Sequence, residues 1–356
     1  MEKIALNKWV RYWMILGLVL IFFQVVIGGI TRLTGSGLSI TKWEIVTGSI
    51  PPLTERGWHE AFQLYKETPQ YQKLNQGMQL TEFKWIYFWE YLHRLWARVM
   101  GLIFIIPFAF FLMRRWLSAM LVKRLTITFV LAGLVGLFGW IMVASGLVDR
   151  PWVNAYKLTV HLCLALLVFG YLEMTVLKAS YDVSKTAQSR SFGIFRVFTG
   201  LLLLQIFVGG LMSGMKASLV YPTFPDFQGE WIPGVLRSSE SWVVENIVNY
   251  DTSPFMSALV QVIHRGIAYC LIISGLYIYW NRFRGIKERF LARISTLWIT
   301  LLVLQICLGI AVLIGSTGVI PVIPGVLHQA VAMLLLAASL AIYYFLRGGG
   351  SEEKLQ

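Results

Sequence analysis

The chain has 356 residues, of which 57% are hydrophobic and only 14% are charged, and its formal net charge is +13. Such a high apolar content excludes an ordinary soluble domain and predicts a polytopic membrane protein. The positive charge does not indicate nucleic-acid binding, because the Lys and Arg residues gather between apolar runs in a pattern typical of membrane topology.

Apolar runs of about 20 residues are long enough to cross a hydrocarbon layer of ~30 Å. The first run is too long for a cleavable secretory signal and lacks a small-residue cleavage site, so we expect it to remain as a span. In chain order, the sequence predicts eight spans, at 12–30, 85–113, 125–147, 156–178, 193–213, 254–280, 295–315 and 322–346. The fold class expected is an all-α membrane protein with eight transmembrane helices.

Positive residues set the expected orientation of these spans. More than half of the Lys and Arg lie before the first span, after the last, or in the segments that follow the second, fourth and sixth. The positive-inside rule then places both termini in the cytoplasm and the long alternate loops outside. An Arg- and Ser-rich transit peptide is missing, which favours a bacterial cytoplasmic (inner) membrane over an organelle. Membrane lipid is therefore a predicted partner and nucleic acid is not.

An internal repeat divides the chain into two halves. The first span ends in QVVIGGITRLTGSG (24–37) and the fifth in QIFVGGLMSGMKAS (205–218), and each is followed by a long outer loop. The next helix of each half carries a His-Arg pair, and the fourth carries one histidine. We expect two pseudo-symmetric four-helix bundles, at 1–180 and 190–350, related in parallel because each half has an even number of spans.

Four of the five histidines share one layer of the membrane. His93, His161, His264 and His328 each lie about six to ten residues from the outer end of a predicted span, or roughly 9–15 Å along a helix. A single histidine in an apolar helix is usually a satisfied core residue, but two per bundle at matching depth suit the axial positions of a haem iron. His59 lies in the first outer loop and is expected to be solvated.

Ionisable residues beside these histidines are costly inside a membrane and call for partners. Arg94 and Arg265 each follow a histidine and could pair with haem propionates, as could Arg98 one turn further along. Arg98 could also pair with Glu90, and all three arginines could instead extend to the membrane surface.

The two halves differ at one position near the histidine. Glu90 lies one turn before His93, whereas Gln261 stands at the equivalent place before His264. Only the glutamate can carry charge or move a proton, although it could also serve as a plain salt-bridge partner. We therefore expect the first half to react and the second half to carry electrons.

These features resemble the haem A synthase family over nearly the whole chain. The segments that carry the resemblance are GGITRLTGSGLSITKW (28–43), EYLHRLWAR (90–98), the region from GG to YPTFPDF (209–227), VQVIHRGIAY (260–269) and VLHQAVA (326–332). The resemblance implies an oxidoreductase that converts the methyl group at carbon C8 of haem O into a formyl group, giving haem A for terminal oxidases. It also implies two pseudo-symmetric four-helix bundles.

Carried over by position, the resemblance implies that His93 and His161 face the substrate haem, with Glu90 beside them as the catalytic group. It implies that His264 and His328 are the axial ligands of a cofactor, haem B. Haem O synthase and terminal-oxidase assembly factors are further partners that such a reaction suggests, and a homo-oligomer is left open. The haem sites would lie toward the periplasmic side.

Two other functions fit part of the pattern. A two-haem membrane cytochrome that takes electrons from quinol would also need paired histidines and arginines, but it explains the difference between Glu90 and Gln261 less well. A transporter would use the histidines as proton relays and would be colourless. The cysteines Cys163, Cys270 and Cys307 all lie in predicted spans, so the chain resembles the branch of the family without a cysteine pair in the first outer loop.

Overall fold

A computed structural model describes residues 2–3, 6–41, 50–147, 150–183 and 189–348. Within these ranges, eight helices are long and apolar enough to cross a membrane, as the sequence predicts. They are α1 (Lys8–Leu33), α4 (Leu80–Met113), α5 (Ala119–Ala144), α6 (Ala155–Ser180), α7 (Phe192–Gly214), α10 (Phe255–Ile278), α11 (Arg289–Ile314) and α12 (Val322–Arg347). A π-helical turn, η4 (Tyr279–Phe283), continues α10.

Several helices begin before the apolar run that predicts them, because capping residues rather than hydrophobicity set their ends. One example is α4, which begins at Leu80 rather than residue 85. There Gln79 and Glu82 form a capping box, in which the main-chain N–H of Gln79 donates to the Glu82 carboxylate at 2.8 Å. Similarly, the Asn7 side chain accepts a hydrogen bond at the start of α1.

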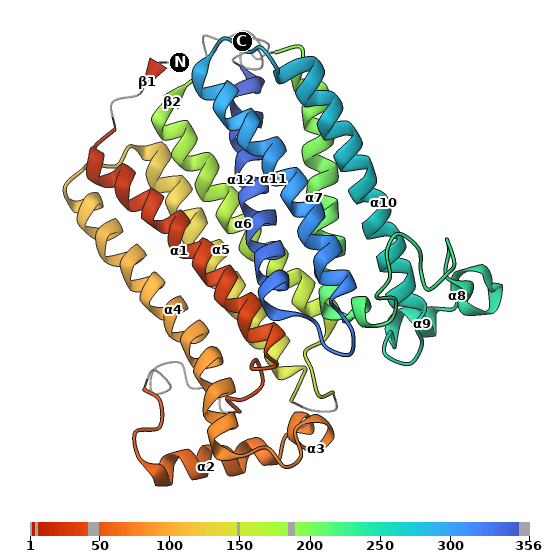
Figure 1. The fold of residues 1–356 in the computed structure, drawn as a ribbon. Helices are drawn as coiled ribbons and strands as arrows, with labels where there is room; N and C mark the ends of the chain where they lie inside the picture. Colours follow the sequence, from red (N-terminus) through yellow and green to blue (C-terminus); the bar gives the residue numbers. More distant parts are fainter. Residues whose placement is uncertain (1, 4–5, 42–49, 148–149, 184–188, 349–356) are drawn as a thin grey trace.

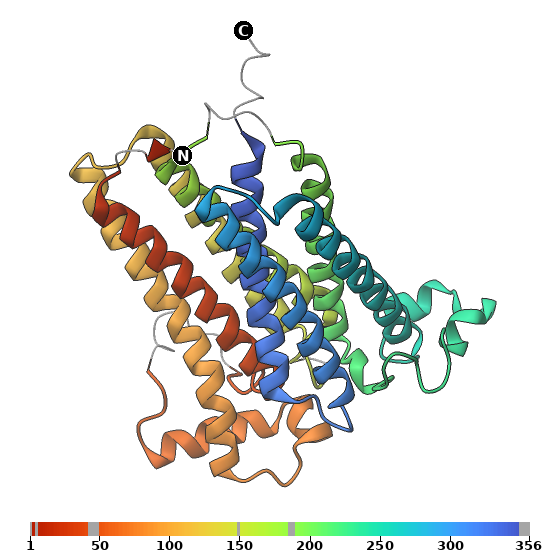
Figure 2. The same cartoon turned by 45° about the horizontal axis from the view of Figure 1, so that its top comes forward.

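Figure 1 shows the long helices side by side, with both chain termini at one end of the bundle, which we call the terminal end. The opposite end, which we call the loop end, carries the short helices. These are α2 (Glu55–Lys66), α3 (Pro69–Leu74), η2 (Ala217–Leu219), α8 (Gly234–Arg237), η3 (Ser239–Ser241) and α9 (Val244–Val248). Figure 2 shows α2 and α3 beneath α4, and α8 and α9 beside α10.

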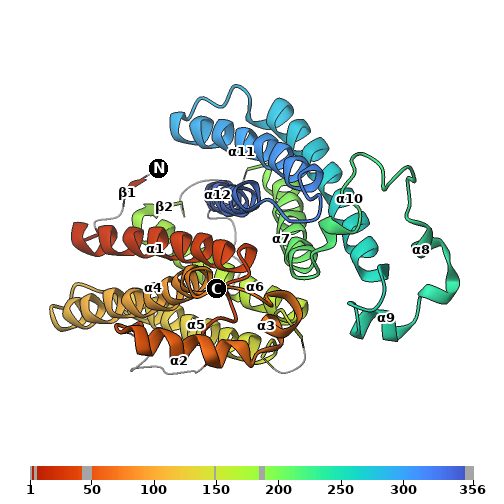
Figure 3. The same cartoon turned by 60° about the horizontal axis from the view of Figure 1, so that its bottom comes forward.

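The two groups of four long helices pack in the same way. In the first group α1 packs on α4 and α6, and α5 packs on α6; in the second, α7 packs on α10 and α12, and α11 packs on α12. Between the groups, α1 contacts α12, α7 contacts α6, and α6 contacts α12. Figure 3, viewed from the loop end, shows the two groups side by side. Under a pseudo-two-fold exchange, the contact of α1 with α12 corresponds to that of α7 with α6, and the contact of α6 with α12 corresponds to itself.

The packed cores of the two groups differ in size. The second group buries Phe195, Phe198 and Trp298, and the Trp298 indole N–H donates to the Ser339 hydroxyl at 3.0 Å. By contrast, α4 and α5 expose most of their apolar surface, as lipid-facing helices do.

A small aromatic cluster explains the early start of α4. Phe83 and Ile86, in its first two turns, pack on Phe62 and Tyr65 of α2. The first outer loop thus contains two helices, divided where Thr68 caps α3. At the terminal end, β1 (Glu2–Lys3) pairs antiparallel with β2 (Tyr181–Asp182), a contact that the sequence does not predict.

Candidate functional site

Each of the four membrane histidines lies against a glycine of a neighbouring helix in its own group. A methyl group in place of a glycine hydrogen would lie 2.9–3.2 Å from the Cε1 atom of the imidazole. The pairs are His93 with Gly28, His161 with Gly139, His264 with Gly209, and His328 with Gly309. The imidazoles therefore lie between helices and do not point at lipid.

The imidazoles also come in pairs. His93 and His161 interact electrostatically with each other, and so do His264 and His328. Over the described residues, no cluster of three or more His, Cys, Asp or Glu side chains could hold a metal ion. Two imidazoles per group, without further metal-ligating side chains gathered around them among the described residues, fit the ligands of a haem better than a bare metal site.

Three of the imidazoles contact the amide of a glutamine. The amide nitrogen of Gln24 lies 3.3 Å from both ring nitrogens of His93. Gln205 lies 3.2 Å from Nε2 of His264. Gln305 and His328 repeat this contact at 3.2 Å. These glutamines are absent from the sequence-based prediction, although the spacing Gln-x₃-Gly recurs in all three helices and could have revealed them.

Glu90 is buried and its carboxylate is fully engaged. Oε2 accepts hydrogen bonds from the Ser39 amide at 2.7 Å, the Ser39 hydroxyl at 2.7 Å and the Ile40 amide at 2.9 Å. Oε1 pairs with Nη2 of Arg94 at 2.5 Å. Glu90 and His93 stand one turn apart on α4. The hydrogen bonds of the Glu90 carboxylate also join α4 to the segment that follows α1. Nothing in the sequence pattern singles out Ser39.

The second group repeats this arrangement with a neutral side chain. Gln261 is fully buried, accepts a hydrogen bond from Arg265 at 2.6 Å and donates to the Ala217 carbonyl at 2.6 Å. Arg265 also donates to the Tyr221 carbonyl at 3.2 Å, just as Arg94 donates to the Ile40 carbonyl at 3.3 Å. In both groups the arginine thus donates to the side chain four residues before it and to a carbonyl of the outer loop.

The arginines predicted to meet propionates bind the loops in this structure. Arg265 donates further hydrogen bonds to the carbonyls of Pro225 and Asp226, at 3.3 and 2.8 Å, and stacks on Phe227 at 4.0 Å. Arg98 lies close enough to Arg94 for their positive charges to interact. His59 is exposed on α2, as expected.

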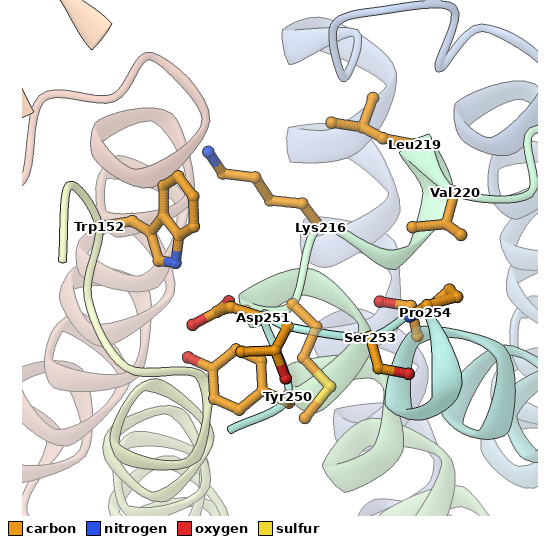
Figure 4. A pocket seen from close by; sticks show the side chains of 12 residues that line it. Trp152, Lys216, Leu219, Val220, Tyr250, Asp251, Ser253 and Pro254 are labelled. Carbon is orange, nitrogen blue, oxygen red and sulfur yellow. The ribbon is translucent and has the colours of Figure 1, made fainter. Parts of the chain in front are cut away.

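A cavity of about 350 Å³ lies at the loop end where the two groups meet. Figure 4 shows the Lys216 side chain extending toward Trp152, with Tyr250 and Asp251 below it. The Lys216 ammonium lies 4.4 Å from the Trp152 ring centroid. Burial and the nearby charge of Arg32 lower the pKa of Lys216, against the opposing effect of Asp251.

Hydrogen bonds hold the second loop on the first group near this cavity. The Ala155 amide, in the first turn of α6, donates to the Tyr250 hydroxyl at 2.8 Å. Arg150 pairs with Asp251 at 3.2 Å. The sequence predicts none of these contacts, because each joins segments about 100 residues apart without any repeated pattern.

Comparisons with known proteins agree with this architecture. The profile of a family described as Cytochrome oxidase assembly protein matches residues 11–340. Heme A synthase of Nitrosospira multiformis is 39% identical over 351 residues, 97% of this chain and 96% of that protein. Heme A synthase of Bradyrhizobium diazoefficiens is 41% identical over 338 residues, 92% of this chain and 88% of that protein. For heme A synthase of Flavobacterium johnsoniae the identity is 36% over 342 residues, with coverages of 93% and 96%.

Proposed function

Because this chain belongs to the cytochrome oxidase assembly protein family and has full-length heme A synthase relatives, we propose that it oxidises haem O to haem A. The observation that carries the proposal is the set of two imidazole pairs, each imidazole lying against a glycine. The comparisons favour the synthase over the two-haem cytochrome, because the relatives share almost the entire chain.

The first group is the proposed site for the substrate, with His93 and His161 facing the haem. Converting the C8 methyl group to a formyl group with water as the oxygen source releases four electrons and four protons. A proton acceptor is therefore needed beside the substrate, and Glu90 is the proposed group, one turn from His93 on α4. Its hydrogen bonds to Ser39 and Ile40 fix the carboxylate in place.

The second group is the proposed site of haem B, with His264 and His328 as axial ligands. Nε2 of each imidazole contacts a glutamine amide, while the buried Nδ1 atoms have no hydrogen-bond partner among the described residues, so one nitrogen of each ring is left for a metal. When bound, haem B would supply a one-electron redox centre. Gln261 in place of a glutamate keeps this site free of a titrating carboxylate at that position.

Arg94, Arg98 and Arg265 are proposed to lie nearest the haem propionates, where a guanidinium matches a carboxylate. In this role, the guanidinium groups of Arg94 and Arg265 would divide their N–H donors between the propionates and the loop carbonyls that they now contact. The loop end is proposed to face the periplasm and both termini the cytoplasm of a bacterial inner membrane. Haem O synthase and terminal-oxidase assembly factors are the proposed protein partners.

Conversion of added haem O by the purified protein in lipid nanodiscs tests this function. Extracted porphyrins should contain a formyl product in the wild type, and none in His93→Ala or His264→Ala. A red protein that binds haem but makes no formyl product would instead be a cytochrome, and a colourless one would favour a transporter. Full conversion by Glu90→Gln would remove the role proposed for that carboxylate.

A further inference from the structure

Glutamine and glycine stand one helical turn apart beside three of the four imidazoles. Gln24 precedes Gly28 on α1, and the same spacing of four residues recurs on α7 and α11. Residues four apart share a helix face, so the amide and the glycine meet the same ring. The contact of Gln205 with His264 at 3.2 Å, beside Gly209, is typical of the three.

The fourth imidazole is held differently. Val135 takes the place of the glutamine, four residues before Gly139 on α5. Nδ1 of His161 lies 3.0 Å from the Val135 carbonyl oxygen. Because a carbonyl can only accept, Nδ1 carries the proton, and Nε2 is the nitrogen that remains for a metal. At His161 the contact is thus a main-chain acceptor on Nδ1, whereas at His264 and His328 it is the nitrogen of a glutamine amide on Nε2.

The glutamines also carry unused acceptors. Among the described residues, the amide oxygens of Gln24, Gln205 and Gln305 are buried without a hydrogen-bond partner. The Nδ1 atoms of His264 and His328 are likewise buried without a hydrogen-bond partner among the described residues. A neutral imidazole that gives one nitrogen to iron carries a proton on the other, which needs an acceptor in a buried site. Each unsatisfied acceptor therefore stands beside a ring that will need one.

We propose that Gln24, Gln205 and Gln305 are positioning residues for the haem-binding histidines, an inference that rests on the proposed function. In the protein without haem the amide nitrogen faces the imidazole; when the histidine binds haem iron, the amide turns over and its oxygen accepts the N–H of the ring nitrogen that does not bind iron. The Val135 carbonyl already accepts that N–H at His161. Because such acceptors increase the electron donation of the ligand, they lower the reduction potential of the haem.

Redox titration of the purified, haem-loaded protein tests this in the second group. Relative to wild type, Gln205→Leu should raise the midpoint potential of the resident haem, and Gln205→Glu, a stronger acceptor, should lower it. Ser274→Ala is the control on α10, because the Ser274 hydroxyl bonds only to carbonyls of its own helix, at Cys270 and Leu271. The control should leave the potential unchanged.

The outcomes separate this inference from the proposed function. Wild-type protein that holds no haem would overturn both, whereas unmoved potentials in haem-bearing Gln205→Leu and Gln205→Glu would overturn the inference alone. If Gln205→Leu loses its haem, Gln205→Glu should retain it, because the glutamate keeps an acceptor oxygen. Loss of haem from both variants would also contradict the inference.

The first group offers a matched pair of substitutions. Gln24→Leu removes a side-chain acceptor, while Val19→Ala, on the same helix, shortens an exposed side chain and removes none. In spectroscopic titrations with haem O, Gln24→Leu should weaken binding to the first group by about five- to tenfold, the effect expected for one lost hydrogen bond. Val19→Ala should bind as the wild type does, and equal weakening by the two would overturn the assignment.

Discussion

Ser39 donates two hydrogen bonds to the buried carboxylate of Glu90, one from its amide and one from its hydroxyl, each 2.7 Å long. With the Ile40 amide and Arg94, these bonds tie the segment that follows α1 to the middle of α4. These hydrogen bonds lie one turn of α4 before His93. The backbone at Ser39 is therefore part of the structure that fixes the histidine layer in the first group.

Glu90→Ala should destabilise the protein by about 3–5 kcal/mol, because it leaves the Arg94 charge and three loop donors unmatched in a buried site. Thermal unfolding in detergent, followed by intrinsic fluorescence, measures the loss. Gln261→Ala is the matched control in the second group, where the lost partner is neutral and the expected cost is about 1–3 kcal/mol. Equal losses of stability in the two variants would contradict a larger contribution from the charged Glu90–Arg94 pair than from the neutral contacts of Gln261.

Gly209→Val should lower the haem content of the purified protein, because the added side chain would enter the space beside His264. Gly200→Val is the control on the same helix, since a Cβ at Gly200 meets nothing within 4 Å. Haem per protein, measured by absorbance after extraction, should fall only in the first variant. A full complement of haem in Gly209→Val would mean that this glycine does not shape the site.

Arg265→Lys should loosen the second loop, because an ammonium cannot reproduce the forked contacts with the Tyr221, Pro225 and Asp226 carbonyls. We expect a loss of about 2–3 kcal/mol from these charged hydrogen bonds. Faster proteolytic cleavage between residues 220 and 253 would report it. Arg237→Lys, at an exposed pair with Glu230 in the same loop, should cleave at the wild-type rate.

Tyr65 should make the α2–α3 region sensitive to alkali. Burial raises the pKa of Tyr65 to about 12, above the value of about 10 in an unfolded chain. Below pH 10 the phenol is protonated in both states, and between pH 10 and 12 only the unfolded state loses its proton. Stability contributed by Tyr65 is therefore lost as pH rises through this window.

Comparison of Tyr65→Phe with wild type checks this pH dependence. Thermal stability of the wild type should fall from pH 10 to 12 more steeply than that of Tyr65→Phe, which has no phenol to titrate at this position. Tyr71→Phe, in the same aromatic cluster, retains Tyr65 and should retain the steep fall. Parallel curves for wild type and Tyr65→Phe would show that another group controls alkaline unfolding.

The eight spans could be predicted because hydrophobic length is a property of the sequence itself. His93 and His264 occupy equivalent places, and so do Glu90 and Gln261, as the repeat requires. The early start of α4 could not be predicted from hydropathy, because Phe83 is buried by α2 and not by the membrane.

The partners of the site residues were the harder part. The tie between Glu90 and Ser39 joins residues 51 apart in sequence, and only the folded chain brings them together. Arg94 and Arg265 follow histidines in sequence, but their side chains reach the loop carbonyls. Sequence spacing gives the helix face on which such residues stand, whereas the direction of a long flexible side chain depends on which acceptors the loops present.

The two groups meet through α6 and α12, because α1 contacts α12 and α7 contacts α6. This arrangement has a consequence for symmetry. Two separate copies of one four-helix ancestor would associate through these same surfaces as a closed dimer. In such a dimer every substitution appears twice, so a carboxylate at one haem could not be replaced by an amide at the other. In a single polypeptide the two positions are specified separately, so Glu90 can stand in one group and Gln261 in the other.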